Sequence, residues 1–148
     1  MIINAVSLKK DSSVDITFGI IQKGNDLGLL MIITGEYGIG SCGNDNGNYI
    51  GSMLSAALYR WRVRYLVLDF SNMVYEMSDS LGKISDVIKK NRSPNYLTFI
   101  IVSQKCKISV LSLVNRLGSK WTVKIITNIS EIYSAQQGDA PGLASPAR

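Results

Sequence analysis

The segment from Tyr65 to Ile88 constrains the fold of this chain more than any other. It opens with Tyr65–Leu68, a short apolar and partly β-branched run that predicts a strand covered on both faces. Asp69 ends the run, and residues with turn chemistry follow it. Ser78 then precedes an apolar series at helical spacing, so we expect a helix with Ser78 as its N-cap. The members of that series are Leu81, Ile84, Val87 and Ile88.

A β-hairpin is predicted before this segment. Val14–Ile21 forms one apolar strand, Gly24–Asp26 has turn chemistry, and Leu27–Thr34 returns as a second strand. The stretch Gly35–Asn48 is rich in Gly and Asn and has no hydrophobic periodicity, which predicts a loop with Asn48 as the N-cap of the next helix. The hairpin should therefore contribute an antiparallel pair of strands.

Helices and strands alternate along the middle of the chain. Apolar spacing predicts a helix from Ile50 to Trp61, with Trp61 buried beside Leu58. A buried strand over Tyr96–Val102 follows, and then a helix that Gly118 can terminate. The predicted buried face of that helix comprises Ile108, Leu111, Val114 and Leu117.

The chain ends with a predicted strand, a short helix and a tail. The strand covers Trp121–Ile126, and Ser130 is the expected cap of a helix that runs through Ala135. Residues 136–148 are rich in Gly, Pro and Ala and lack an apolar face, which predicts a disordered tail. The order β-β-α-β-α-β-α-β-α predicts an α/β fold with a mixed, mostly parallel sheet, in a single domain over residues 1–135.

Composition excludes several classes of function. The 148 residues include no histidine, which excludes Ser-His-Asp and Cys-His catalysis and imidazole zinc sites. The two cysteines, Cys42 and Cys106, make neither a disulfide framework nor a metal site. No apolar run is long enough for a membrane span and no secretory signal is visible, so we expect a cytoplasmic protein without a membrane partner. The net charge of +5 permits an anionic partner without requiring one.

The segment Gly38–Gly43 matches the GxGxxG pattern of dinucleotide-binding loops. Three observations favour an ordinary glycine loop instead. The helical spacing starts only at Ile50, the preceding strand belongs to a hairpin, and the next acid at a strand end, Asp69, lies farther on than the typical ~20 residues. We therefore expect no cofactor, and a nucleotide-binding or carboxylate-dependent enzyme is the least favoured function.

Two groups of charged residues have ordinary structural explanations. Asp69, Glu76 and Asp79 could bind Mg²⁺ or share acid–base duty, but turn chemistry and a helix N-terminus also account for them. Arginines interleaved with aromatic residues over Tyr59–Tyr65 could follow a nucleic-acid backbone, but a solvated basic face explains them better. We expect neither a metal site nor nucleic-acid binding.

Three segments resemble the STAS domain family, which includes bacterial anti-sigma-factor antagonists. They are Ile33–Glu36, which reads Ile-Thr-Gly-Glu; Leu66–Ser71, which reads Leu-Val-Leu-Asp-Phe-Ser; and Met77–Gly82, which reads Met-Ser-Asp-Ser-Leu-Gly. The resemblance covers most of the chain and implies a sheet with helices mainly on one face. It places Ser78 on the family's phosphorylatable serine.

The residues around Ser78 depart from the family's pattern. Met77 replaces an aspartate, Asp79 a second hydroxyl residue and Ser80 a glycine, and Gly38 stands where the first loop usually has an acid. Asp79 is therefore the acid directly beside Ser78 in this chain.

The resemblance implies a non-enzymatic regulator that docks a protein partner, such as an anti-sigma-factor kinase-like protein, through the N-terminus of the Ser78 helix. Ser78 is the phosphorylation candidate. The expected partner-binding residues are Ser78, Asp79, Ser80, Gly82, Glu36 and Gly38. The alternative is an immunity protein that neutralises a cognate bacterial toxin.

Overall fold

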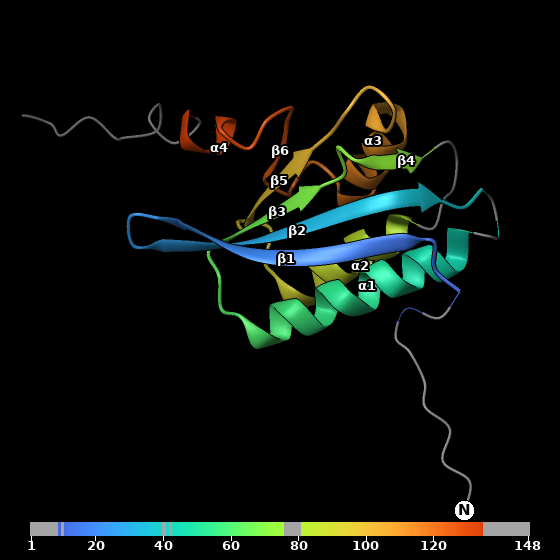
Figure 1. The fold of residues 1–148 in the computed structure, drawn as a ribbon. Helices are drawn as coiled ribbons and strands as arrows, with labels where there is room; N and C mark the ends of the chain where they lie inside the picture. Colours follow the sequence, from blue (N-terminus) through green and yellow to red (C-terminus); the bar gives the residue numbers. More distant parts are fainter. Residues whose placement is uncertain (1–8, 10, 40, 42, 76–80, 135–148) are drawn as a thin grey trace, which may run out of the picture.

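The computed structural model of the protein describes residues 9, 11–39, 41, 43–75 and 81–134 (Figure 1). Residues 136–148, the predicted tail, lie outside this range, and the single-domain boundary stays a prediction. The described elements are β1 (Val14–Lys23), β2 (Asp26–Tyr37), α1 (Gly43–Arg60), β3 (Tyr65–Asp69), β4 (Met73–Tyr75), α2 (Gly82–Asn91), β5 (Leu97–Ile101), α3 (Lys107–Leu117), β6 (Val123–Ile126) and α4 (Glu131–Ser134).

The described strands form one sheet in the order β1-β2-β3-β5-β6, and β4 pairs with the end of β2 (Figure 1). β1 and β2 are antiparallel, whereas β3, β4, β5 and β6 all run parallel to their neighbours. This confirms the predicted mixed, mostly parallel sheet that begins with a hairpin. β4 was not predicted, because a strand of three residues is too short to show a period.

Three of the helices cover one face of the sheet. The helix α1 connects β2 to β3, α2 precedes β5, and α3 connects β5 to β6, and the path β2-β3-β5-β6 moves across the sheet in one direction. Right-handed crossovers that move in one direction place their helices on the same side of the sheet. The main core lies there, between the sheet and α1, α2 and α3, and includes Met31, Leu54, Leu68, Ile84 and Leu113. The predicted arrangement of helices mainly on one face is therefore confirmed.

A smaller core lies on the other face of the sheet, under α4 (Figure 1). Alternate residues of each strand point to opposite faces, so the same strands serve both cores. The buried residues of this second cluster are Ile21, Tyr65, Val67, Phe99, Ile101, Ile126 and Ile132.

The prediction of a loop up to Asn48 was wrong, because α1 begins at Gly43. The first turn of α1 is anchored by Asn46, which is buried. Its Oδ1 atom accepts hydrogen bonds from the hydroxyl of Ser12 at 2.7 Å and the backbone N–H of Ser13 at 3.0 Å. These tertiary contacts override the low helix propensity of a segment rich in Gly and Asn.

The other end of α1 also differs from the prediction. The helix stops at Arg60, and Trp61 is 38% exposed rather than buried with Leu58. The indole instead lies beside Phe18 of β1, with ring centroids 6.5 Å apart. Apolar spacing placed Trp61 on the correct side of α1 but did not show that the helix had already ended.

The predicted buried face of α3 was partly wrong. Val110, Leu113 and Leu117 are buried, whereas Ile108 is 84% exposed and Leu111 is 38% exposed. The buried stripe begins at Cys106, just before the helix, where the thiol donates to the carbonyl oxygen of Phe70 at 3.3 Å. Two apolar series with similar spacing run along this segment, and packing at its start selects between them.

The predicted cap of the last helix was also wrong. Asn128, not Ser130, is the capping residue, because its Oδ1 atom accepts the backbone N–H of Ser130 at 2.9 Å. Glu131 completes a capping box by accepting the N–H of Asn128 at 3.0 Å. Its carboxylate also accepts the N–H and the hydroxyl of Thr127, at 2.9 and 2.8 Å. These hydrogen bonds lower the pKa of the Glu131 carboxyl below its ordinary value.

None of the helices in the described part of the chain combines the length and the apolar character that crossing a membrane requires.

Candidate functional site

The predicted partner-binding residues that the structure describes lie at one end of the sheet. Glu36 is exposed near the end of β2 and pairs with Val74 of β4, and Gly38 follows β2 directly. Gly82 is the first residue of α2. Ser78, Asp79 and Ser80 lie outside the described residues, between the end of β4 and the start of α2. Of the predicted residues, Gly82 alone belongs to α2 in the described part of the chain, and the grouping of the six residues into one surface stays a prediction.

The start of α2 is closely packed. Leu81 precedes the helix, is fully buried, and provides no side-chain cap. Gly82 lies against Arg116 of α3, because a Cβ atom at Gly82 would lie 2.5 Å from an Arg116 guanidinium nitrogen. The same guanidinium is 3.6 Å from the carboxylate of Asp86, which is on the next turn of α2. A positive charge therefore lies on the first turn of this helix.

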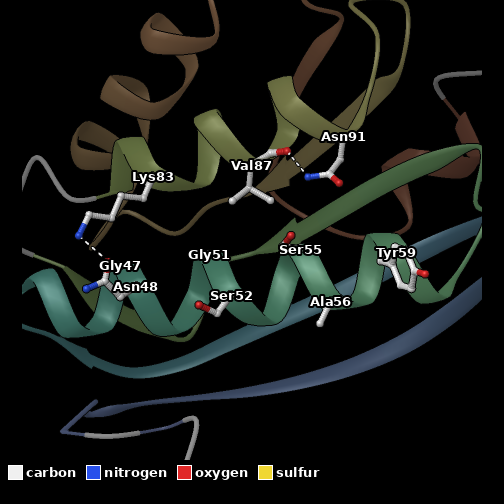
Figure 2. Close-up of a pocket in the computed structure, with 10 residues that line it drawn as sticks. All are labelled: Gly47, Asn48, Gly51, Ser52, Ser55, Ala56, Tyr59, Lys83, Val87 and Asn91. Carbon is white, nitrogen blue, oxygen red and sulfur yellow. Dashed lines mark hydrogen bonds between the residues drawn. The ribbon is translucent and has the colours of Figure 1, made fainter.

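A groove of about 640 Å³ separates the outer sides of α1 and α2 (Figure 2). At one end, the Lys83 ammonium of α2 donates to the Asn48 side-chain oxygen of α1 at 2.7 Å. At the other end lie Asn91 and Tyr59, and Tyr59 is 90% exposed. Between them, the α1 wall consists of small residues, which are Gly47, Gly51, Ser52, Ser55 and Ala56.

Asp69, the described member of the predicted acidic cluster, has a structural role. The carboxylate of Asp69 accepts the N–H and the hydroxyl of Ser71, at 2.9 and 2.6 Å, and so it stabilises the turn after β3. Glu76 and Asp79, the other two members of the predicted acidic cluster, lie outside the described residues. Within the described ranges, no group of three Cys, Asp or Glu side chains could hold a metal ion.

One of the three arguments against a dinucleotide loop was wrong, because α1 begins at Gly43, inside the GxGxxG match. A second was incomplete, because β2 belongs to the predicted hairpin but also opens a parallel βαβ unit with α1 and β3. Two other observations now disfavour such a site. The acidic side chain of Asp45 lies in the first turn of α1, where a pyrophosphate would bind. Apart from the short strand β4, which pairs with the end of β2, the described parallel strands also progress in one direction from β2 to β6, so this path has no switch point.

Several basic residues that suggested nucleic-acid binding have partners within the protein. Arg64 is 3.2 Å from the carboxylate of Asp26, and the Arg60 guanidinium lies 5.8 Å from the centre of the Trp61 ring.

Basic residues at the C-terminal end of α2 also have partners within the protein. Lys89 donates to the carbonyl of Arg116 at 2.6 Å, and Arg92 donates to the carbonyl of Leu58 at 3.2 Å. Arg92 also lies over the ring of Tyr96, 5.0 Å from its centre. Burial raises the pKa of the Tyr96 phenol, although Arg92 opposes the shift. These contacts favour a structural role for Lys89 and Arg92.

Sequence reasoning missed the groove, the residue Lys83 that lines it, and Arg116, which lies against Gly82. Lys83 and Arg116 belong to helices that meet only in the folded protein, so no local pattern marks them. The small residues of α1 did leave a signal, because Gly47, Gly51 and Ser55 recur every four residues along one side of a helix. That spacing was hidden by the prediction of a loop over the same segment.

Comparison with known proteins shows the fold. No protein-family model matches the sequence, and no curated protein sequence matches it. Among solved structures, an anti-sigma factor antagonist from Mycobacterium paratuberculosis is similar, with a TM-score of 0.57 and 12% sequence identity over 86% of this chain and 97% of that chain. An uncharacterized protein from Shewanella loihica with a SpoIIAA-like fold has a TM-score of 0.53 and 12% identity, over 82% of this chain and 94% of that chain.

This protein therefore has the fold of anti-sigma factor antagonists. The resemblance to STAS domains seen in the sequence is confirmed for the fold.

Proposed function

We propose that this chain is a non-enzymatic, cytoplasmic regulator that binds another protein, as anti-sigma factor antagonists do. The observation that carries the proposal is the match of nearly the whole length of such an antagonist to 86% of this chain. The alternative of an immunity protein has no comparable support, since the two similar structures described above are an anti-sigma factor antagonist and an uncharacterized protein.

The proposed docking surface combines the start of α2 with the groove between α1 and α2. The small side chains along α1 let a partner's helix or loop approach closely, and the Lys83 ammonium and the Tyr59 ring offer polar and aromatic contacts beside them. Ser78, Asp79 and Ser80 precede this surface in the chain, and the proposal adds Glu36 and Gly38 from the end of β2 to it. A partner that is a kinase-like anti-sigma factor would contact both parts.

Phosphorylation of Ser78 would change the charge of this surface. A phosphate adds about two negative charges next to Asp79, and a partner that binds the uncharged form would be repelled. The dipole of α2 and the guanidinium of Arg116 would favour the phosphate within this protein. The proposed regulator is therefore released from its partner when it is phosphorylated.

Partner capture tests the docking surface. The full chain, immobilised and incubated with a lysate of the source cell, is expected to retain a kinase-like anti-sigma factor, identified by mass spectrometry. Ser52→Arg places a long cation in the groove and should abolish retention. The matched control is Ser112→Arg, which makes the same change at an exposed position of α3 and should retain the partner. Retention of a toxin instead would support the immunity alternative and overturn the proposal.

Intact-mass measurement tests the switch. With the captured kinase and ATP, the wild-type chain should gain the mass of one phosphoryl group and Ser78→Ala should gain none. An unchanged wild-type mass, or an equal gain in the Ser78→Ala chain, would contradict phosphorylation at this serine.

A further inference from the structure

The outer edge of β1 is an unusually long and apolar strand edge. β1 has ten residues, and every one of them is paired with β2 without a bulge. No described strand lies on its other side (Figure 1). Between Asp15 and Lys23 it carries neither charge nor proline, the features that usually protect an edge from pairing. The opposite edge, β6, has only four residues and contains Lys124.

The backbone of β1 can accept another strand. A two-residue loop, Gly24-Asn25, joins β1 to β2, so its flanking residues Lys23 and Asp26 form a hydrogen-bonded pair. Counting back from that pair, the odd-numbered residues of β1 bond to β2. The even-numbered residues, Phe18 and Ile20 among them, direct their N–H and C=O groups outward. An extended strand would find an unbroken row of donors and acceptors.

Gly19, at the middle of β1, has no role that this chain by itself explains. Its φ is not positive, and a Cβ atom there would meet only Leu30, at an ordinary distance of 3.8 Å. Glycine weakens a strand interior, and it often marks a place where another backbone comes close. The middle of an open edge is such a place.

We propose that β1 pairs antiparallel with β1 of a second copy of this chain, about a two-fold axis at Gly19. A two-fold axis makes each contact occur twice. This alignment sets Asp15 of each copy opposite Lys23 of the other, so that opposite charges meet at both ends of the joined strands. It sets Phe18 opposite Ile20, both with outward backbone groups, and brings the two Gly19 residues together. The two sheets become one continuous sheet.

The apolar surface beside β1 supports the same alignment. Ile20 is 47% exposed on the helix-covered side of the sheet. Next to it is a hollow of about 180 Å³, lined by residues that include Phe18 and the half-exposed Trp61. In the proposed pair, Ile20 of each copy lies over Phe18 of the other and fills this hollow. The exposed apolar groups of each copy therefore cover those of the other.

Sedimentation of the full chain over a series of concentrations tests the proposal. We expect a monomer–dimer equilibrium for the wild type. Ile20→Lys should weaken the dimer by at least about tenfold, because it replaces a buried apolar contact with a charge. Ile125→Lys makes the same change at a 38%-exposed position of the opposite edge strand and should leave the dimer unchanged.

A mixing experiment tests the alignment. Asp15→Lys and Lys23→Glu should each weaken self-association, because each sets like charges opposite one another. An equimolar mixture of the two variants should form dimers again, since every facing pair then has opposite charges. Within each copy, Asp15 also contacts Lys9 at 2.5 Å, and Lys23 donates to the carbonyl of Tyr133 at 3.0 Å. Mixing leaves those internal contacts unchanged, so recovery reports only on the contact between copies.

Three outcomes would overturn the proposal. The wild type could stay monomeric at every concentration up to its solubility limit. Ile125→Lys could weaken the dimer as much as Ile20→Lys, which would place the interface elsewhere. The mixed variants could remain monomeric, which would exclude this alignment. A monomer whose outward β1 amides resist hydrogen exchange would show that another segment of the same chain occupies the edge instead.

Discussion

The sheet has two faces, and the helices cover them unequally. α1, α2 and α3 bury one face in a continuous core, whereas the four-residue helix α4 lies over a small cluster on the other. The groove between α1 and α2 belongs to the first face, so the proposed docking surface stands on the most extensively packed part of the molecule. A binding surface benefits from such support, because rigid elements hold their side chains in place.

The largest expected effect is a loss of core packing on the three-helix face. Phe70 is fully buried there, and Phe70→Ala should lower the free energy of unfolding by about 3–5 kcal/mol. Urea denaturation followed by circular dichroism measures the change. A loss below about 1 kcal/mol would show that this core tolerates a cavity and that the contrast between the faces is overstated.

The second largest expected loss of stability is at Gly28, where an aromatic ring packs against a glycine on the α4 face of the sheet. Gly28 of β2 is paired with Tyr65 of β3, and a Cβ atom at Gly28 would lie 2.1 Å from the buried tyrosine ring. Gly28→Ala should therefore cost about 3 kcal/mol, at the upper end of overpacking effects. Gly19→Ala is the matched control in monomer-forming conditions, because its added methyl group meets only Leu30. Equal stability of the two variants in urea titrations would refute the close contact.

A smaller loss is expected where α4 meets the sheet. Ile132 is the fully buried residue of α4, and Ile132→Ala should cost about 2 kcal/mol. Hydrogen exchange should show faster exchange around α4, while the amides of α1 and α2 keep their protection. Faster exchange throughout the chain would mean that the two faces unfold together and are not independent.

The smallest effect is a dependence of stability on pH at the cap of α4. Because hydrogen bonds lower the pKa of Glu131 in the folded state, its carboxylate stabilises the fold above the ordinary value of 4.5, and this contribution is lost as the pH falls through the lowered pKa. Glu131→Gln should thus lower the Tm at neutral pH and have little effect in strong acid. Thermal melts of both proteins from neutral to acidic pH measure this, and a difference that does not vary with pH would contradict it.

Most of the fold could be predicted because its signals are local. The buried strand at Tyr65–Leu68 and the hairpin from Val14 each have a continuous pattern that needs no partner to be recognised. The predictions were wrong where the local pattern was compatible with two different arrangements. In α3, the choice between Ile108 and Val110 as a buried residue depended on where Cys106 packs, and in α1 the helix start depended on Asn46 and its hydrogen bonds to the segment before β1.

The candidate site could be predicted only in part. Glu36, Gly38 and Gly82 were predicted from the resemblance to STAS domains, and the structure places them near the end of β2 and at the start of α2. Lys83 and Arg116 were missed, because their contacts with Asn48 and Gly82 join elements far apart in the chain. Ser78, Asp79 and Ser80 remain predictions, since they lie outside the described residues.

The amino-acid sequence by itself determined the order of elements apart from β4, the mostly parallel sheet and the absence of histidine chemistry, since each follows from residue type and spacing. The apolar run from Tyr65 to Leu68, for example, predicts a buried strand from its own residues. Only the tertiary structure decided that Gly43 begins a helix, that a groove lies between α1 and α2, and that β1 has no described strand on its outer side. Those features depend on contacts between distant segments, and local patterns contain no information about which segments meet.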